Sequence, residues 1–147
     1  MKPGRDSQRS RVYAWEQTEI APHDPTEVAF ANVQGMVNAI WSEAGLKYPP
    51  KVEPLAAQST TTLAQATRLS IQVPPKTPAW IILHEVAHAM TATHDGNSDG
   101  HGSLFMGLYV GLLTRYMRLP RDVLLASLRL AAIDIKLDAL PVFFDER

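Results

Sequence analysis

The chain has 147 residues, with 14 basic and 15 acidic side chains, a formal net charge of −1 and no cysteine. This length predicts a single domain, residues 1–147, with a hydrophobic core of useful size. The near-neutral charge argues against nucleic-acid binding by bulk electrostatics, and the lack of cysteine excludes disulfides and thiolate metal ligands. No apolar run follows the basic N-terminus, and the longest uncharged apolar stretch, 104–113, is too short to span a bilayer. We therefore expect a cytoplasmic protein with no membrane partner.

The N-terminal segment, residues 1–20, is predicted to contain a short helix over 5–18, ahead of a core formed by 21–147. This helix has a basic face that carries Arg5, Arg9 and Arg11. Charged faces of this kind are usually solvated, and we favour that interpretation here.

A longer helix is predicted over 28–44. Asp24 and Thr26 are good capping residues for its start, and Gly45 is a typical residue for its end.

Two strands are predicted next, over 51–57 and 66–73. In the second, the apolar residues Leu69, Ile71 and Val73 alternate with polar ones, which is the pattern of a half-buried strand. An exposed edge strand at this place would offer main-chain pairing to an extended peptide, although the pattern fits a plain structural strand equally well.

The most informative motif is His84-Glu85-x-x-His88 on a third predicted helix, which Thr77 and Pro78 begin. Residues four apart share one helical face, so the two imidazoles can bind a single metal ion. Glu85 is then placed to take a proton from a water molecule, as in zinc hydrolases. The alternative is a core helix whose histidines only make hydrogen bonds, and the paired geometry makes us favour the metal.

A catalytic zinc site needs a third protein ligand and keeps the fourth position open. The candidates in the turn-rich stretch that follows are His94, Asp95, Asp99 and His101. A continued helix would turn His94 away from the site, whereas His101 follows the loop and can return to the metal. We therefore predict that His84, His88 and His101 bind the metal.

The same loop resembles the first half of an EF-hand calcium loop, from Asp95 to Gly100. The twelfth position of that motif, which should be Glu, is Met106. We therefore interpret the loop as a polar reversal rather than a calcium site.

Together, His84-Glu85-x-x-His88 and His101-Gly102-x-x-Phe105 resemble the SprT-like, zincin-type zinc metallopeptidases over residues 66–106. The opening, 5–16, and the overall size resemble more closely a family of small predicted metallohydrolases of actinobacteria and their phages. These resemblances imply Zn²⁺ bound by the three histidines, with Glu85 as the general base. They are also the only reason to consider roles for Arg9, Tyr13 and Glu16. SprT-like proteins that act on DNA-bound protein usually add a zinc ribbon, which a chain without cysteine cannot form.

The predicted function is that of a zinc metallohydrolase, most plausibly a peptidase that acts on a peptide or protein. The alternatives are hydrolysis of a small-molecule amide or ester, and a metal-binding interaction module without catalysis. The oxyanion of the reaction needs a hydrogen-bond donor. The sequence does not distinguish among four candidates for this donor, which are Arg68, Tyr109, Arg115 and Tyr116.

Two further helices are predicted, over 103–117 and 121–139, followed by an apolar tail over 142–144. The fold class is therefore α+β, a zincin-like single domain. A small, mainly antiparallel sheet is expected to pack with the HExxH helix and the other helices.

Overall fold

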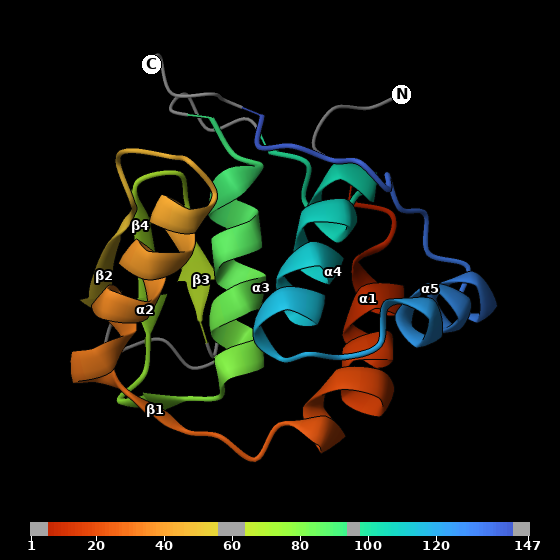
Figure 1. Cartoon of the computed structure of the whole chain (residues 1–147), viewed down its shortest axis with the longest axis horizontal. Coiled ribbons are helices and arrows are strands. Elements are labelled where there is room, and N and C mark those ends of the chain that lie inside the picture. Colours follow the sequence, from red (N-terminus) through yellow and green to blue (C-terminus); the bar gives the residue numbers. More distant parts are fainter. Residues whose placement is uncertain (1–5, 56–63, 94–97, 143–147) are drawn as a thin grey trace.

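The computed structural model describes residues 6–55, 64–93 and 98–142. The chain forms a mixed α+β structure, as predicted. Figure 1 shows helix α3 (Ala79–Met90) in the middle of the molecule. The strands and helix α2 (Phe30–Glu43) lie on one side of it, and helices α4 (Ser103–Tyr116), α1 (Arg9–Trp15) and α5 (Arg121–Leu130) lie on the other. No helix in the described ranges has the length and apolar character needed to cross a membrane.

The main sheet has the strand order β2-β4-β3, built from β2 (Lys51–Pro54), β4 (Ser70–Val73) and β3 (Gln65–Ala66). Strand β3 is antiparallel to β4, but the longest pairing, β2 with β4, is parallel. The expectation of a mainly antiparallel sheet is therefore only partly met. A separate antiparallel pair joins β1 (Val28–Ala29) to β5 (Lys76–Thr77).

The strand predicted over 66–73 is a tight hairpin instead. The Thr67 hydroxyl accepts hydrogen bonds from the backbone N–H groups of Leu69 (3.2 Å) and Ser70 (3.1 Å), which turns the chain between β3 and β4. Strand β4 is therefore central, and β3 is the edge strand. The first predicted strand ends at Pro54, and its last two expected residues, 56 and 57, lie outside the described ranges.

The predicted capping residues act on a different helix. Trp80 N–H donates to Asp24 Oδ2 (2.8 Å) and Ala79 N–H donates to Thr26 Oγ1 (2.9 Å), so both side chains cap α3. The buried Thr77, which the sequence suggested as this cap, makes no side-chain hydrogen bond to the described residues. Helix α2 begins at Phe30, after the short strand β1, rather than at residue 28.

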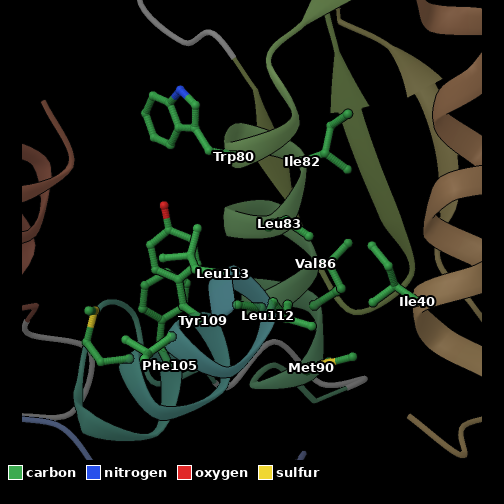
Figure 2. Packing of buried hydrophobic residues seen from close by; sticks show 14 of the residues in the cluster. Ile40, Trp80, Ile82, Leu83, Val86, Met90, Phe105, Tyr109, Leu112 and Leu113 are labelled. Atoms are coloured by element: carbon green, nitrogen blue, oxygen red, sulfur yellow. The ribbon is translucent and has the colours of Figure 1, made fainter. Parts of the chain in front are cut away.

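Helix α3 is nearly all buried because it packs on both sides of the molecule. Ile82, Leu83, Val86 and Met90 are no more than 1% exposed, and Figure 2 shows them between Ile40 of α2 and the aromatic and leucine side chains of α4. At the usual value of about 1.5–3 kcal/mol for a buried aliphatic side chain, this contact is a main contribution to the stability of the fold.

Helix α5 is shorter than predicted and ends at Leu130. Ala132 adopts a left-handed φ of 58°, and the N–H of Ile133 bonds back to the carbonyl of Leu128 at 3.0 Å, which closes the helix. The following segment crosses α4 close to Gly107, where a Cβ atom would lie 2.1 Å from the Lys136 carbonyl oxygen. Of the predicted apolar tail, Val142 donates its N–H to the Met90 carbonyl, and residues 143–144 lie outside the described ranges.

The N-terminal segment belongs to the same core. Val12, Trp15 and Ile20 lie in one hydrophobic cluster with the side chains of α3 and α4. Helix α1 continues as a π-helical turn, η1 (Glu16–Ile20), so the segment stays helical beyond residue 18.

Candidate metal centre and active-site cleft

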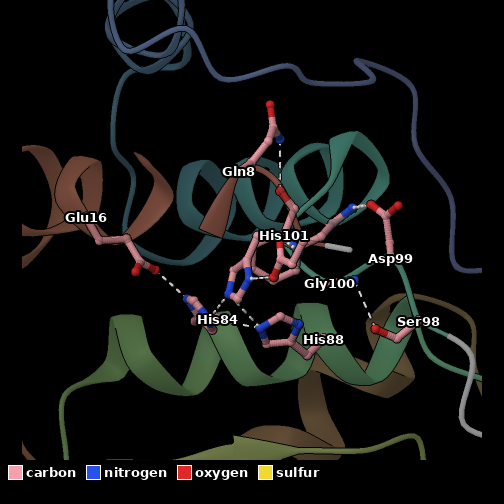
Figure 3. Close-up of polar contacts among 10 residues, drawn as sticks. Gln8, Glu16, His84, His88, Ser98, Asp99, Gly100 and His101 are labelled. Atoms are coloured by element: carbon pink, nitrogen blue, oxygen red, sulfur yellow. Dashed lines mark hydrogen bonds and ion pairs between the residues drawn. The ribbon is translucent and has the colours of Figure 1, made fainter. Parts of the chain in front are cut away.

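Three histidine side chains converge on one point. His84 and His88 lie one turn apart on α3, and His101 comes from the loop just before α4. Their Nε2 atoms are 3.0 Å (His84 to His88), 3.2 Å (His88 to His101) and 3.4 Å (His84 to His101) apart. Figure 3 shows His101 reaching across to the two rings on α3. The three residues predicted from the sequence are thus brought together as one group able to hold a metal ion.

Hydrogen bonds alone do not account for this triangle. Nδ1 of His84 faces Glu16 and Nδ1 of His101 faces Asp6, so in the neutral rings these nitrogens carry the hydrogen and both Nε2 atoms present lone pairs. The His84–His101 contact then has no donor, and His88 can donate to only one of the other two. A cation between the nitrogens resolves the conflict. A tetrahedral zinc ion, with Zn–N bonds of about 2.0–2.1 Å, holds its ligand nitrogens about 3.3–3.4 Å apart, so the three residues fit the metal.

Burial keeps the imidazoles of His84 and His88 neutral, which a metal ligand requires. It lowers the pKa of His84 to about 3, with a smaller effect from the nearby His101. Burial likewise lowers the pKa of His88 well below its ordinary value. Both rings of the α3 pair therefore have free lone pairs at neutral pH.

The buried carboxylate of Glu16 orients His84. It accepts hydrogen bonds from Nδ1 of His84 and, at 2.7 Å, from the hydroxyl of Tyr109 on α4. Burial raises the pKa of Glu16 to about 7, against the lowering effects of the Tyr109 hydrogen bond and His101. A carboxylate behind a ligand histidine fixes the tautomer of the ring and raises its basicity.

Asp6 plays the same part for His101. Its Oδ2 lies 2.5 Å from Nδ1 of His101, and its Oδ1 accepts the backbone N–H of the same residue at 3.1 Å. Gln8 supports this arrangement by donating from Nε2 to the His101 carbonyl oxygen at 2.9 Å, as Figure 3 shows. Gln8 Oε1 also accepts the backbone N–H of Asp134 at 2.5 Å. The N-terminal segment therefore braces two of the three histidines.

Glu85 lies at the edge of a cleft of about 530 Å³ beside the three histidines. Helices α1 and α3, the turn η1 and strand β3 all supply side chains that line this cleft. Burial and, secondarily, the charge of Glu16 raise the pKa of Glu85 to about 8. The cleft is lined by Arg9, Tyr13, Glu16, Gln17, Ala64, Gln65, Ala66, Trp80, Ile81, His84, Glu85, His88 and Ser98.

Asp99, one of the four candidates for the third ligand, has a structural role instead. Its Oδ2 accepts the backbone N–H of Phe105 at 2.9 Å and so caps the start of α4. His94 and Asp95, the other two, lie outside the described residues, as does part of the loop that resembles an EF-hand.

None of the four suggested oxyanion donors lines the cleft. The Tyr109 hydroxyl is fully buried and donates to Glu16. Arg115 and Tyr116 both contact Glu43, and Arg68 is buried and donates to the Tyr48 carbonyl oxygen. These suggestions were wrong because the sequence does not show which side chains become neighbours.

Two of the bracing residues, Asp6 and Gln8, gave no signal in the sequence analysis. Glu16 was considered only because of the family resemblance. Their contacts with the loop and with α3 span 68 to 95 positions, and neither helical periodicity nor motif spacing reports pairings at that distance. The local clue in the sequence was that Glu16 directly follows Trp15 and lies four residues before Ile20, so that a helix would place this carboxylate beside apolar side chains that face the core.

Comparison of the chain with protein-family profiles, with curated proteins and with solved structures gave no significant match.

Proposed function

We propose that the chain is a zinc-dependent hydrolase that cleaves amide bonds, and that its substrates are peptides or proteins. The observation that supports this most strongly is the position of Glu85. It shares α3 with two of the converging histidines and lines the open cleft beside them. A purely structural zinc site has no use for such a residue and normally closes its fourth position with a ligand.

The metal, once bound, would polarise the scissile carbonyl and lower the pKa of a water molecule to about 7. Glu85 takes a proton from the attacking water and passes it to the leaving amine. Glu16 and Asp6 hold His84 and His101 with their Nε2 lone pairs toward the ion. Three imidazoles would also accept cobalt, nickel or copper, so zinc is part of the proposal.

A peptide substrate is favoured by the position of β3. Gln65 and Ala66 form the edge strand of the main sheet and are among the residues that line the cleft, so an edge strand borders the proposed reaction centre. An extended peptide could pair with this edge, a mode of binding that a small amide would not use. Membership of the SprT-like or zincin group and a cytoplasmic location remain predictions from the sequence.

The test begins with tag-free protein purified without added metal, whose zinc content is measured by elemental mass spectrometry. About one zinc per chain is expected. The same preparation is then assayed against unfolded labelled casein and against a panel of acylated small molecules. Cleavage of casein supports the peptidase, and cleavage of the small molecules alone supports the second candidate. Failure to bind zinc even when it is supplied would reject both.

A further inference from the structure

Tyr13 is the tyrosine that lines the cleft, and it makes no hydrogen bond to the described residues that brace the histidines. Tyr13 lies on α1, is 42% exposed, and lines the same cleft as Glu85. Its ring is 5.0 Å from the ring of His101 and 6.3 Å from the ring of His84, measured between centroids. The phenol therefore stands beside two of the three converging histidines, on the solvent side.

Tyr109 provides the contrast. Its ring is also close to His84, at 5.2 Å, but its hydroxyl is buried and committed to Glu16. Of the two tyrosines that contact the histidines, only Tyr13 reaches the cleft, so only Tyr13 can touch a substrate.

Arg9 lies one helical turn before Tyr13, and its guanidinium group is close to the Tyr13 ring. Its guanidinium carbon is 5.5 Å from the centroid of the Tyr13 ring, a cation–π distance. Arg9 is the only residue with a cationic side chain, apart from the histidines, among those that line the cleft in the described ranges.

We propose that Tyr13 is a catalytic residue that donates a hydrogen bond to the oxyanion of the tetrahedral intermediate, and that Arg9 is its positioning residue. This inference rests on the proposed function. In the step concerned, the water oxygen bonds to the carbonyl carbon, the C=O π pair moves onto the carbonyl oxygen, and Glu85 takes the water proton. Tyr13 keeps its own proton throughout and binds the new negative charge. When the C–N bond breaks, an electron pair of the oxyanion re-forms the C=O double bond, the C–N pair goes to the nitrogen, and Glu85 delivers its proton to that nitrogen as it leaves.

The first experiment compares wild type, Tyr13→Phe and Tyr48→Phe with labelled casein as substrate. Tyr48→Phe is the matched control, since that ring is 69% exposed and does not line the cleft. Loss of one oxyanion donor typically lowers kcat by about 100- to 1,000-fold. We expect a loss of this order in kcat for Tyr13→Phe, with KM and zinc content within twofold of wild type. Tyr48→Phe should match the wild type. A raised KM with unchanged kcat would overturn the proposal by making Tyr13 a substrate-binding residue, and a loss of zinc would overturn it by making Tyr13 a metal ligand.

The second measurement needs no turnover. Inorganic phosphate has tetrahedral oxygens like those of the intermediate, and its binding to the cobalt-loaded protein can be followed in the visible spectrum. We expect Tyr13→Phe to weaken phosphate binding by about tenfold and to leave chloride binding unchanged. Chloride is a single atom, so once it is bound to the cobalt ion it has no oxygen that could accept a hydrogen bond from Tyr13. Equal phosphate affinities would overturn the proposal. Arg9→Lys keeps the charge and should retain more activity than Arg9→Ala, whereas equal activities would reject the positioning role of Arg9.

The two levels of inference fail in different ways. A wild-type protein that hydrolyses nothing, or that binds no metal, rejects the proposed function and the role of Tyr13 with it. A wild type that depends on Glu85 for activity, with a fully active Tyr13→Phe variant, rejects the role of Tyr13 alone.

Discussion

Glu16 accepts a hydrogen bond from Nδ1 of His84, although the two residues are 68 positions apart in the chain. One end of this contact lies in the N-terminal segment and the other on the helix at the centre of the molecule. Because removing a carboxylate behind a ligand histidine typically costs about 10- to 100-fold in metal affinity, the contact can be tested directly.

Glu16→Gln should lower zinc affinity by about 10- to 100-fold, since the amide is a weaker acceptor for the His84 ring and cannot raise its basicity. Zinc affinity is measured by competition with a chromophoric chelator. Glu19→Gln, three residues along the same segment, is the control and should bind zinc like the wild type. Equal affinities for the wild type and Glu16→Gln would show that Glu16 does not support the site.

A substitution at Gly100 provides a second test of the candidate metal centre. Its φ is 61°, and a Cβ atom there would lie 3.0 Å from the carboxylate carbon of Asp6. Gly100→Ala should cost about 1–2 kcal/mol in backbone strain and should disturb the hold of Asp6 on His101, so zinc affinity should also fall. Gly35→Ala is the control, because that exposed helical position has no atom within 4 Å of the new Cβ. It should stabilise the fold by up to about 1 kcal/mol. Chemical denaturation measures the change in the free energy of unfolding, and competition with a chelator measures the change in zinc affinity. A Gly100→Ala protein as stable as the wild type would show that an alanine is not strained at this position.

The choice of the third ligand is tested by removing each candidate histidine. His101→Ala should weaken zinc retention at least tenfold, because one of three protein ligands is lost. His94→Ala should leave zinc retention nearly unchanged. Metal content after dialysis is the measurement, and the reverse pattern would assign the third ligand to His94.

Glu85→Gln should keep zinc and lose nearly all hydrolysis, because an amide cannot accept the proton from water. The control is Glu27→Gln, which changes an exposed glutamate outside the cleft lining. Retention of more than a tenth of the wild-type activity with casein would show that Glu85 is not the base.

The stability of the zinc-free protein should depend on pH through Glu85. Burial raises the pKa of this carboxyl to about 8, from an ordinary value of 4.5. The folded chain therefore holds this proton more tightly than the unfolded chain does. The resulting stabilisation is full below about pH 4.5 and is lost as the pH rises through 8. In EDTA, the unfolding free energy of the wild type minus that of Glu85→Gln should fall steadily between pH 5 and 8. A flat difference would mean that Glu85 titrates normally.

The sequence was most informative where the signal is local. The spacing of His84 and His88 on an apolar segment predicted both the helix and the approach of the two rings, and the helix predicted over 103–117 is found at Ser103–Tyr116. The proximity of His101 was also inferred correctly, because a turn-rich loop must reverse the chain and the candidates in it were few.

The prediction was poor where a residue's partner lies far away in the chain. Asp24 and Thr26 have the right chemistry for helix caps, but the helix they cap begins more than 50 residues later. The end of α5 was missed because the left-handed position is an alanine, Ala132, where a glycine would have given the signal. The parallel pairing of β2 with β4 likewise depends on contacts across the sheet that no local pattern encodes.

The side chain of Gln8 makes hydrogen bonds with the backbone of both His101 and Asp134, which has a consequence for the protein during its synthesis. Translation delivers Asp6, Gln8 and Glu16 first, but their partners emerge much later, and Asp134 is among the last of them. The bracing contacts therefore cannot all form on the ribosome until Asp134 has left the exit tunnel. A nascent chain that has not yet released Asp134 would therefore lack the complete set of contacts that brace the histidines.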